Sequence, residues 1–234
     1  MQWRSVSFLA ALVVVLSGCQ SLYLGHGAIE AVTATGDVAE IASTFSKSEL
    51  LFSSARKFEK AGQIGEAIKL YEKAASASPE NDPDFLEANR HLAILYDLSA
   101  QSKKARRCFQ VAMQSKDVDA DLLNDYGYFL LKQEDFGEAS KVLRSAHREF
   151  PQNERIATNL GMALVSSGRV EDGFRLFESK VGKNDAIANV GAILLQQGKT
   201  EEGKAWLQQV ENTEETNSKV AQMLRAADQS TSTR

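Results

Sequence analysis

Residues 120–150 read ADLLNDYGYFLLKQEDFGEASKVLRSAHREF and are followed by Pro151. This pattern predicts a helix, a short turn and a second helix. Ala139 in this stretch has a counterpart 34 residues earlier, Ala105, and another 34 residues later, Gly173, each within a similar phrase. The spacing indicates an internal repeat, and the rest of the chain extends this array, caps it or attaches it to something else.

Five such units can be followed between Ser48 and Val210. In the third unit the repeated positions are Tyr126, Gly127, Phe136, Ala139, Leu143, Ala146 and Pro151. In spacing and residue type the units resemble the tetratricopeptide repeat (TPR), a helix–turn–helix unit. The resemblance implies an all-α fold, an α-solenoid of about five TPR units. In such a fold, small residues let two helices cross closely while aromatic and aliphatic neighbours fill the space between helices.

Two spacings depart from the 34-residue period. Ala67 and Ala105 are 38 residues apart, whereas Gly173 and Gly203 are 30 apart, so that about one helical turn is inserted and then deleted. Gly173 and Gly203 also stand where other units have alanine, and glycine inside a helix costs about 1 kcal/mol against alanine. Either an unusually close helix crossing or a weaker C-terminal half would explain them, and the sequence leaves both open.

The array is expected to span residues 48–212 and to be followed by a capping helix over residues 213–228. Val220, Met223, Leu224 and Ala227 form an apolar stripe with helical spacing there. Repeat arrays need such a helix to cover their last unit. The polar residues 229–234 are expected to form a disordered tail.

The N-terminus carries a basic residue, Arg4, then an unbroken apolar run, Phe8–Leu16. Nine residues are too few to span a bilayer and fit a signal peptide, here residues 1–18. The following Leu16-Ser17-Gly18-Cys19 resembles the lipobox of bacterial lipoproteins, which implies acylation of Cys19 and a membrane anchor. An ordinary signal peptide with a chance cysteine is the alternative. Residues 19–47 are read as a tether with a leading helix from about Val38.

The residues after Cys19 bear on its destination. Gln20 and Ser21 follow the cysteine, and no aspartate stands there. By the sorting rule of enterobacterial lipoproteins this resembles an outer-membrane passenger. We therefore expect a protein of the bacterial cell envelope, lipid-anchored in the outer membrane and facing the periplasm.

Composition and motifs argue against several functions. A net charge of −4 and a pI near 5.5 disfavour nucleic acid as a partner. The three histidines, His26, His91 and His147, lie far apart in the sequence, and no Gly-rich phosphate loop is present. We therefore expect no catalytic residues, no metal, no cofactor and no small-molecule substrate, and hence no enzyme.

The TPR resemblance implies that the first helix of each pair lines a concave groove. The positions that face this groove are Arg90, Ile94, Leu98, Asn124, Tyr128, Leu131, Lys132, Thr158, Met162, Val165 and Leu195; in the first unit they are Arg56, Glu59 and Lys60. The middle of this set is apolar and would suit an amphipathic helix or an extended peptide from a protein partner. The alternative is that superhelical packing, or the C-terminal helix folding back, already buries the strip.

The general layout resembles the repeat-bearing lipoproteins that help to assemble pili and secretion channels, including pilotins and the tight-adherence (Flp) pilus group. This resemblance implies a membrane-anchored protein-interaction scaffold. Two alternatives stay open: a factor in outer-membrane or cell-envelope biogenesis, and a non-catalytic accessory subunit of an envelope enzyme.

Overall fold

The computed structural model describes residues 14–16, 20–22, 46–80, 82–210 and 220–225. Five consecutive helix pairs occupy the repeat region and confirm the expected all-α fold class. The chain divides into two compact units, Met1–Lys116 and Asp117–Arg234, which are described separately below.

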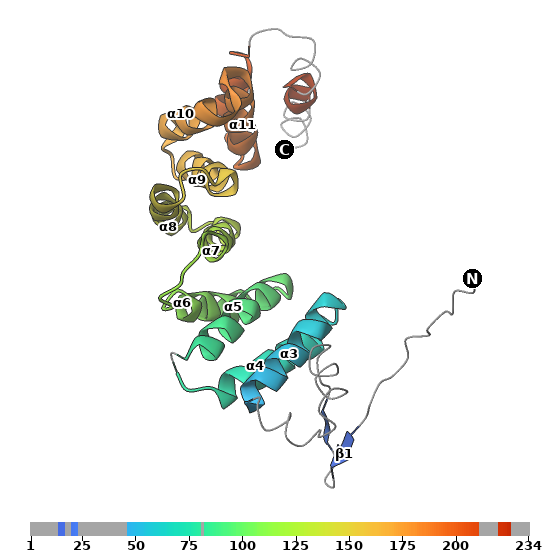
Figure 1. Ribbon diagram of the computed structural model, residues 1–234. Coiled ribbons are helices and arrows are strands. Elements are labelled where there is room, and N and C mark those ends of the chain that lie inside the picture. Colours follow the sequence, from blue (N-terminus) through green and yellow to red (C-terminus); the bar gives the residue numbers. More distant parts are fainter. Residues whose placement is uncertain (1–13, 17–19, 23–45, 81, 211–219, 226–234) are drawn as a thin grey trace, which may run out of the picture. The chain divides into compact units, whose positions relative to one another are not determined.

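The first unit contains two helix pairs. They are α3 (Lys47–Lys60) with α4 (Ile64–Ala77), and α5 (Pro83–Leu98) with α6 (Ser102–Ala112). Each helix packs against the next along the chain, and α3 also touches α5 (Figure 1).

The second unit contains three helix pairs. They are α7 (Ala120–Lys132) with α8 (Phe136–Glu149), α9 (Glu154–Ser166) with α10 (Val170–Val181), and α11 (Lys183–Gln196) with α12 (Thr200–Leu207). The first helices of these pairs also pack side by side, α7 against α9 and α9 against α11. Residues 220–225 form a further helical segment.

Polar side chains fix where the first helix of most pairs begins. The side-chain oxygens of Ser46, Asp82, Asp119 and Asn153 each accept a hydrogen bond from a backbone N–H in the first turn. These N–H groups have no partner within the helix, so the caps satisfy them. Pro83 follows Asp82 as the first helical residue, a position where the missing N–H of proline costs nothing.

The turn inside each pair has one residue in the left-handed region of backbone space. These residues are Gly62, Ala100, Glu134, Gly168 and Gly198, with φ between 56° and 86°. Glycine reaches this region freely, whereas alanine and glutamate do so at a cost. The same turn is therefore built five times, twice from residues that disfavour it.

Helix crossings place small residues where the sequence predicted them. A Cβ atom added to Gly127 would collide with the side chain of Leu143, and one added to Gly161 would lie 2.6 Å from the Phe177 ring. Ala139 is fully buried at the same kind of contact. The large side chain of the second helix thus fills the space that a glycine leaves on the first.

Gly173 and Gly203 lie at crossings where the backbones of two helices approach closely. A Cβ on Gly173 would lie 3.0 Å from the backbone oxygen of Gly161, and one on Gly203 would lie 3.0 Å from that of Gly191. Each would also press on a side chain of the first helix, Val165 in the case of Gly173. Of the two explanations that the sequence left open, the structure therefore supports close crossing.

The irregular spacings change the helices and their connections together. The insertion lengthens α5, which has 16 residues where α9 has 13. The deletion falls mainly in a connection, because Gly182 alone joins α10 to α11. The adjacent pairs nevertheless remain packed, α4 against α5 and α10 against α11.

Two short strands precede the helices and were not expected. They are β1 (Val14–Leu16) and β2 (Gln20–Leu22), which pair antiparallel with Val15 opposite Ser21. The consecutive β-branched residues of β1 favour extended backbone. The expected signal peptide, Cys19 and the tether otherwise lie outside the described residues.

Candidate functional site

The second unit has a groove on the face formed by its first helices, with a cavity volume of about 580 Å³. We call it the α7–α9–α11 groove. Its lining residues are Tyr128, Leu131, Lys132, Glu134, Phe136, Met162, Ser166, Ile193, Gln196, Gln197 and Lys199.

Local sequence explains which side chains reach the groove. Gly127 and Gly161 turn toward the second helix of their own pairs. The residues that follow them, Tyr128 and Met162, point about 100° further around the helix and so reach another face. A glycine followed by a large apolar residue on a first helix is therefore the local signature of this groove.

The groove combines an apolar floor with charged residues. Leu131 and Ile193 are almost fully buried and Met162 is half-buried, whereas Tyr128 is 47% exposed. The Nζ atom of Lys132 lies 5.6 Å from the centroid of the Tyr128 ring, within cation–π range. Such a surface can hold an apolar side chain of a partner and a neighbouring polar group.

The structure brings four of the expected groove residues together. Tyr128, Leu131, Lys132 and Met162 all line the cavity. Thr158, one turn before Met162 on α9, is exposed but is not among the lining residues.

Val165 was expected to face the groove, and the structure corrects this. It is fully buried in a core cluster with Phe177, Ala186 and Val190. The reason is the close crossing: because Gly173 has no side chain, α10 approaches α9 and Val165 fills the contact. Val165 is therefore unavailable to a partner.

Asn124 is also buried, with 2% exposure. Its Oδ1 accepts a hydrogen bond of 2.9 Å from Nδ2 of Asn159, and its own Nδ2 lies 3.3 Å from Oδ1 of Asp125. Arg155 on α9 also binds Asp121 and Asp125 on α7. These polar contacts join neighbouring first helices and satisfy Asn124 internally.

Leu195 lies under the C-terminal segment. Ala188 and Leu207 form a core cluster with Val220, which is 8% exposed, and Leu195 packs against that cluster together with Met223 and Leu224. The C-terminal segment therefore covers Leu195, whereas Ile193 and Gln196 of the same helix still line the groove. The remaining residues of the expected capping helix lie outside the described part of the chain.

Arg90, Ile94 and Leu98 lie on α5 and so belong to the first unit. Arg90 Nη1 is 4.0 Å from Glu87 Oε2, Ile94 is half-buried and Leu98 is exposed. These residues do not line the α7–α9–α11 groove.

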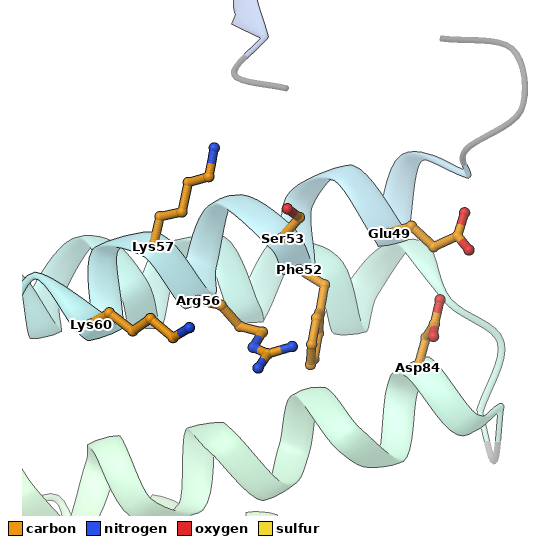
Figure 2. A pocket seen from close by; sticks show the side chains of 7 residues that line it. All are labelled: Glu49, Phe52, Ser53, Arg56, Lys57, Lys60 and Asp84. Atoms are coloured by element: carbon orange, nitrogen blue, oxygen red, sulfur yellow. The ribbon is translucent and has the colours of Figure 1, made fainter. Parts of the chain in front are cut away.

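The first unit has its own pocket, of about 350 Å³, between α3 and α5. Its lining residues are Glu49, Phe52, Ser53, Arg56, Lys57, Lys60 and Asp84 (Figure 2). Arg56 and Lys60 were expected to face the groove, whereas Phe52 and Asp84 were not identified from sequence. Phe52 stands one turn before Arg56, which is the periodicity that could have revealed it.

Glu59, the third expected groove position of the first unit, belongs to a half-buried cluster. Its Oε2 accepts a hydrogen bond of 2.7 Å from the Tyr71 hydroxyl and lies 2.9 Å from His91 Nδ1. The Tyr71 and His91 rings stack with centroids 4.7 Å apart. Burial disfavours the charged ring, but hydrogen bonds and the charges of Glu87 and Glu59 outweigh it and raise the pKa of His91.

Several residues of the α7–α9–α11 groove were missed from sequence, among them Ile193, Lys199 and Gln197. Gln197 Nε2 donates a hydrogen bond of 3.1 Å to the backbone oxygen of Ser166 and so ties α11 to α9. Its Oε1 is buried without a hydrogen-bond partner among the described residues. Gln197 and Lys199 belong to the turn inside the fifth pair, a region that helix periodicity does not cover.

No group of three or more His, Cys, Asp or Glu side chains in the described ranges could hold a metal ion. None of the helices that the structure describes is long and apolar enough to cross a membrane.

Comparison with known proteins supports the TPR fold. The structure of YrrB, a TPR protein with an unusual peptide-binding site, matches with a TM-score of 0.58 and 17% identity, over 85% of this chain and 92% of YrrB. MamA from Desulfovibrio magneticus, solved from residue 41 to its end, matches with a TM-score of 0.58 and 16% identity, over 78% of this chain and 97% of the solved chain. No model of a protein family matches the chain.

A search by sequence finds similarity to a pilus-assembly protein. The type IV pilus assembly protein PilF of Pseudomonas aeruginosa is 28% identical over 107 residues, which make up 45% of this chain and 42% of PilF. The chain therefore spans less than half of PilF in this alignment. The solved PilF structure matches with a TM-score of 0.51 and 17% identity, over 77% of this chain and 88% of that chain. The chain has the TPR fold and resembles a pilus-assembly protein in sequence.

Proposed function

Starting from a TPR fold, we propose that this protein is a membrane-anchored scaffold that binds a segment of a partner protein in the α7–α9–α11 groove. The observation that carries the proposal is the groove itself, a cavity with an apolar floor along three neighbouring first helices. Scaffolding rather than catalysis is the function that fits such a surface.

The dimensions of the groove favour a peptide segment. Its volume of about 580 Å³ is within the range of about 300–1,000 Å³ that is usual for ligand pockets. An amphipathic helix could lay one or two apolar side chains on Met162, Leu131 and Ile193, in the helix-in-groove mode. Lys132 and Lys199 would then stand beside the polar face of that helix.

We further propose a role in the assembly of a pilus or secretion system. The similarity to PilF, a type IV pilus assembly protein, favours this role, and the peptide-binding site of YrrB supports peptide recognition by a similar fold. Acylated Cys19 would hold the protein in the cell envelope, in the outer membrane and facing the periplasm. Cell-envelope biogenesis, or service to an envelope enzyme as an accessory subunit, remains the alternative pathway.

A photo-crosslinking amino acid in the groove tests partner binding. Placed at Tyr128 in cells, it should capture one defined envelope protein. Placed at Lys141, an exposed position on the second helix α8, it should not. Introducing Met162→Glu should abolish capture from Tyr128, because a charge would be buried against the apolar floor. Equal capture from both positions, or capture unaffected by Met162→Glu, would refute groove binding.

The anchor has a separate test. In Cys19→Ala the acylated thiol is lost, so we expect the protein to leave the membrane fraction and appear in the soluble periplasmic fraction. Ser17→Ala, a change next to the expected cleavage site that keeps the cysteine, serves as the control. Unchanged membrane fractionation of Cys19→Ala would contradict the anchor without affecting the groove.

A further inference from the structure

The pocket between α3 and α5 shares no lining residue with the α7–α9–α11 groove, and the proposed function does not use it. Its charges are unevenly compensated. Three cations, Arg56, Lys57 and Lys60, line it together with two acids, Glu49 and Asp84.

Both acids already serve the local fold. Glu49 accepts a hydrogen bond of 2.6 Å from the backbone N–H of Ser46 and closes the capping box of α3. Asp84 accepts a hydrogen bond of 3.1 Å from the Ser48 hydroxyl and stands in the first turn of α5, where a negative charge is favourable. The hydrogen bonds of both carboxylates are therefore made to residues at the start of α3 and not to the cations of the pocket.

Arg56 and Lys60, in contrast, have no structural role of this kind. Within the described part of the chain, neither side chain has a hydrogen-bond or ion-pair partner. In Figure 2 the Arg56 guanidinium and the Phe52 ring extend side by side from α3 toward α5, whereas Lys57 points away. Phe52, Arg56 and Lys60 follow one another at four-residue intervals, so they form one stripe along the helix.

We infer that this pocket binds the carboxylate of an acidic side chain, Asp or Glu, carried by a peptide segment of a protein partner. The planar guanidinium of Arg56 matches a carboxylate with two parallel hydrogen bonds, and Lys60 adds a second positive charge one turn away. Phe52 offers an apolar face to the residue next to the acid. The volume of about 350 Å³ is near the lower limit of about 300 Å³ for ligand pockets, which fits one or two residues.

The charge balance selects a carboxylate over a phosphate. With Lys57 turned away, the charges of Arg56 and Lys60 are set against those of Glu49 and Asp84, so a ligand with one negative charge meets less repulsion than a ligand with two. A phosphate group carries about 1.5 to 2 negative charges at neutral pH, and the excess would face Glu49 and Asp84. The pocket is therefore built for a monoanion.

Three model peptides test the inference on the full 234-residue chain in non-ionic detergent micelles. Each is a capped hexapeptide of glycine and serine with a central pair: Phe–Glu, Phe–Gln or Phe–phosphoserine. Binding is followed through the side-chain Nε–H resonances of ¹⁵N-labelled arginine, and loss of a peak in Arg56→Lys identifies that of Arg56. We expect Phe–Glu to shift this peak and to bind about tenfold more tightly than Phe–Gln.

Variants separate a specific site from general charge attraction. Arg56→Gln and Lys60→Gln should each weaken Phe–Glu binding, Arg56→Gln by about tenfold because the bidentate contact is lost. Lys73→Gln removes the same charge from an exposed position on α4 and should leave binding unchanged. Circular dichroism checks that all variants fold.

Four outcomes would overturn the inference: no peptide binding up to about 10 mM, near the weak limit for a specific contact; equal binding of Phe–Glu and Phe–Gln; tighter binding of Phe–phosphoserine; or an equal loss in Lys73→Gln. None of these would touch the α7–α9–α11 groove, because crosslinking from Tyr128 reports on that groove independently.

Discussion

Replacing Gly173 by alanine tests whether close crossing governs the fold of the second unit. Two opposing effects determine how much the substitution changes the free energy of unfolding. Alanine gains about 1 kcal/mol over glycine inside a helix. The new methyl group, however, would lie 2.5 Å from Val165 Cγ2 and 3.0 Å from the backbone oxygen of Gly161. The side chain of Val165 is fully buried and a backbone oxygen cannot rotate away, so α10 must move off α9.

Overpacking of a well-packed core costs about 1–3 kcal/mol, and a collision with backbone belongs in the upper part of that range. After the helix gain is subtracted, we expect Gly173→Ala to lower the free energy of unfolding by about 1–2 kcal/mol. For a chain of this size that corresponds to a fall in Tm of about 2–8 °C.

Gly137→Ala is the matched control, because Gly137 also lies in a second helix, α8, and an added Cβ there meets nothing within 4 Å. It should leave stability unchanged or raise it by up to about 1 kcal/mol. Thermal melts by circular dichroism at 222 nm measure both variants, and hydrogen exchange should place the loss in α9 and α10. A Gly173→Ala protein at least as stable as Gly137→Ala would refute the reasoning.

Three further predictions concern other elements. Ala100→Gly and Glu134→Gly should each stabilise the protein by about 0.5–1 kcal/mol, because glycine accepts their positive φ; unchanged Tm values would contradict this. His91 has a raised pKa, so its contribution to stability is fully present below its ordinary value of 6.5 and is lost as the pH rises through the raised pKa. Urea melts across this range should therefore show a fall that His91→Gln abolishes, and an unaltered pH profile in that variant would exclude the histidine. Burial, and after it the charge of Glu72, raise the pKa of Cys108 to about 11. In a Cys19→Ala variant, where Cys108 is the single cysteine, a thiol reagent at pH 8 should therefore label the protein only after unfolding. Rapid labelling of the folded protein would show that the thiol is accessible.

Much of the fold could be predicted because its determinants are local. The 120–150 stretch forms α7 and α8 as expected, since caps, turn residues and small crossing residues all lie within one repeat. The polar cap at Asp82 and the glycine at Gly127 act through neighbours in the same or the next helix. Each therefore leaves a recognisable mark in the sequence.

The site was only partly predictable because the exposure of a residue depends on the size of its neighbours. Tyr128 and Met162 line the groove as projected, but Val165 is drawn into the core by the absence of a side chain at Gly173. Asn124 accepts a hydrogen bond from Asn159, which stands 35 residues later, and nothing in the sequence spacing marks these two residues as a pair. Assigning groove-facing positions from the repeat pattern treats all repeats alike and therefore misses such differences between them.

The boundary between the two compact units was also invisible in the sequence. The 34-residue spacing continues from Ala105 to Ala139, on either side of Lys116 and Asp117. Spacing counts residues and records which helices resemble each other. It does not record which of them form one compact body.

Val220 is buried in the same core cluster as Ala188 and Leu207, and this has a practical consequence for preparing the protein. A version shortened after Val210 would leave Ala188, Leu195 and Leu207 facing water, and such an apolar patch promotes self-association. Affinity tags and fluorescent fusions at the carboxyl end should therefore be joined beyond Arg225, so that the final helical turn stays in place.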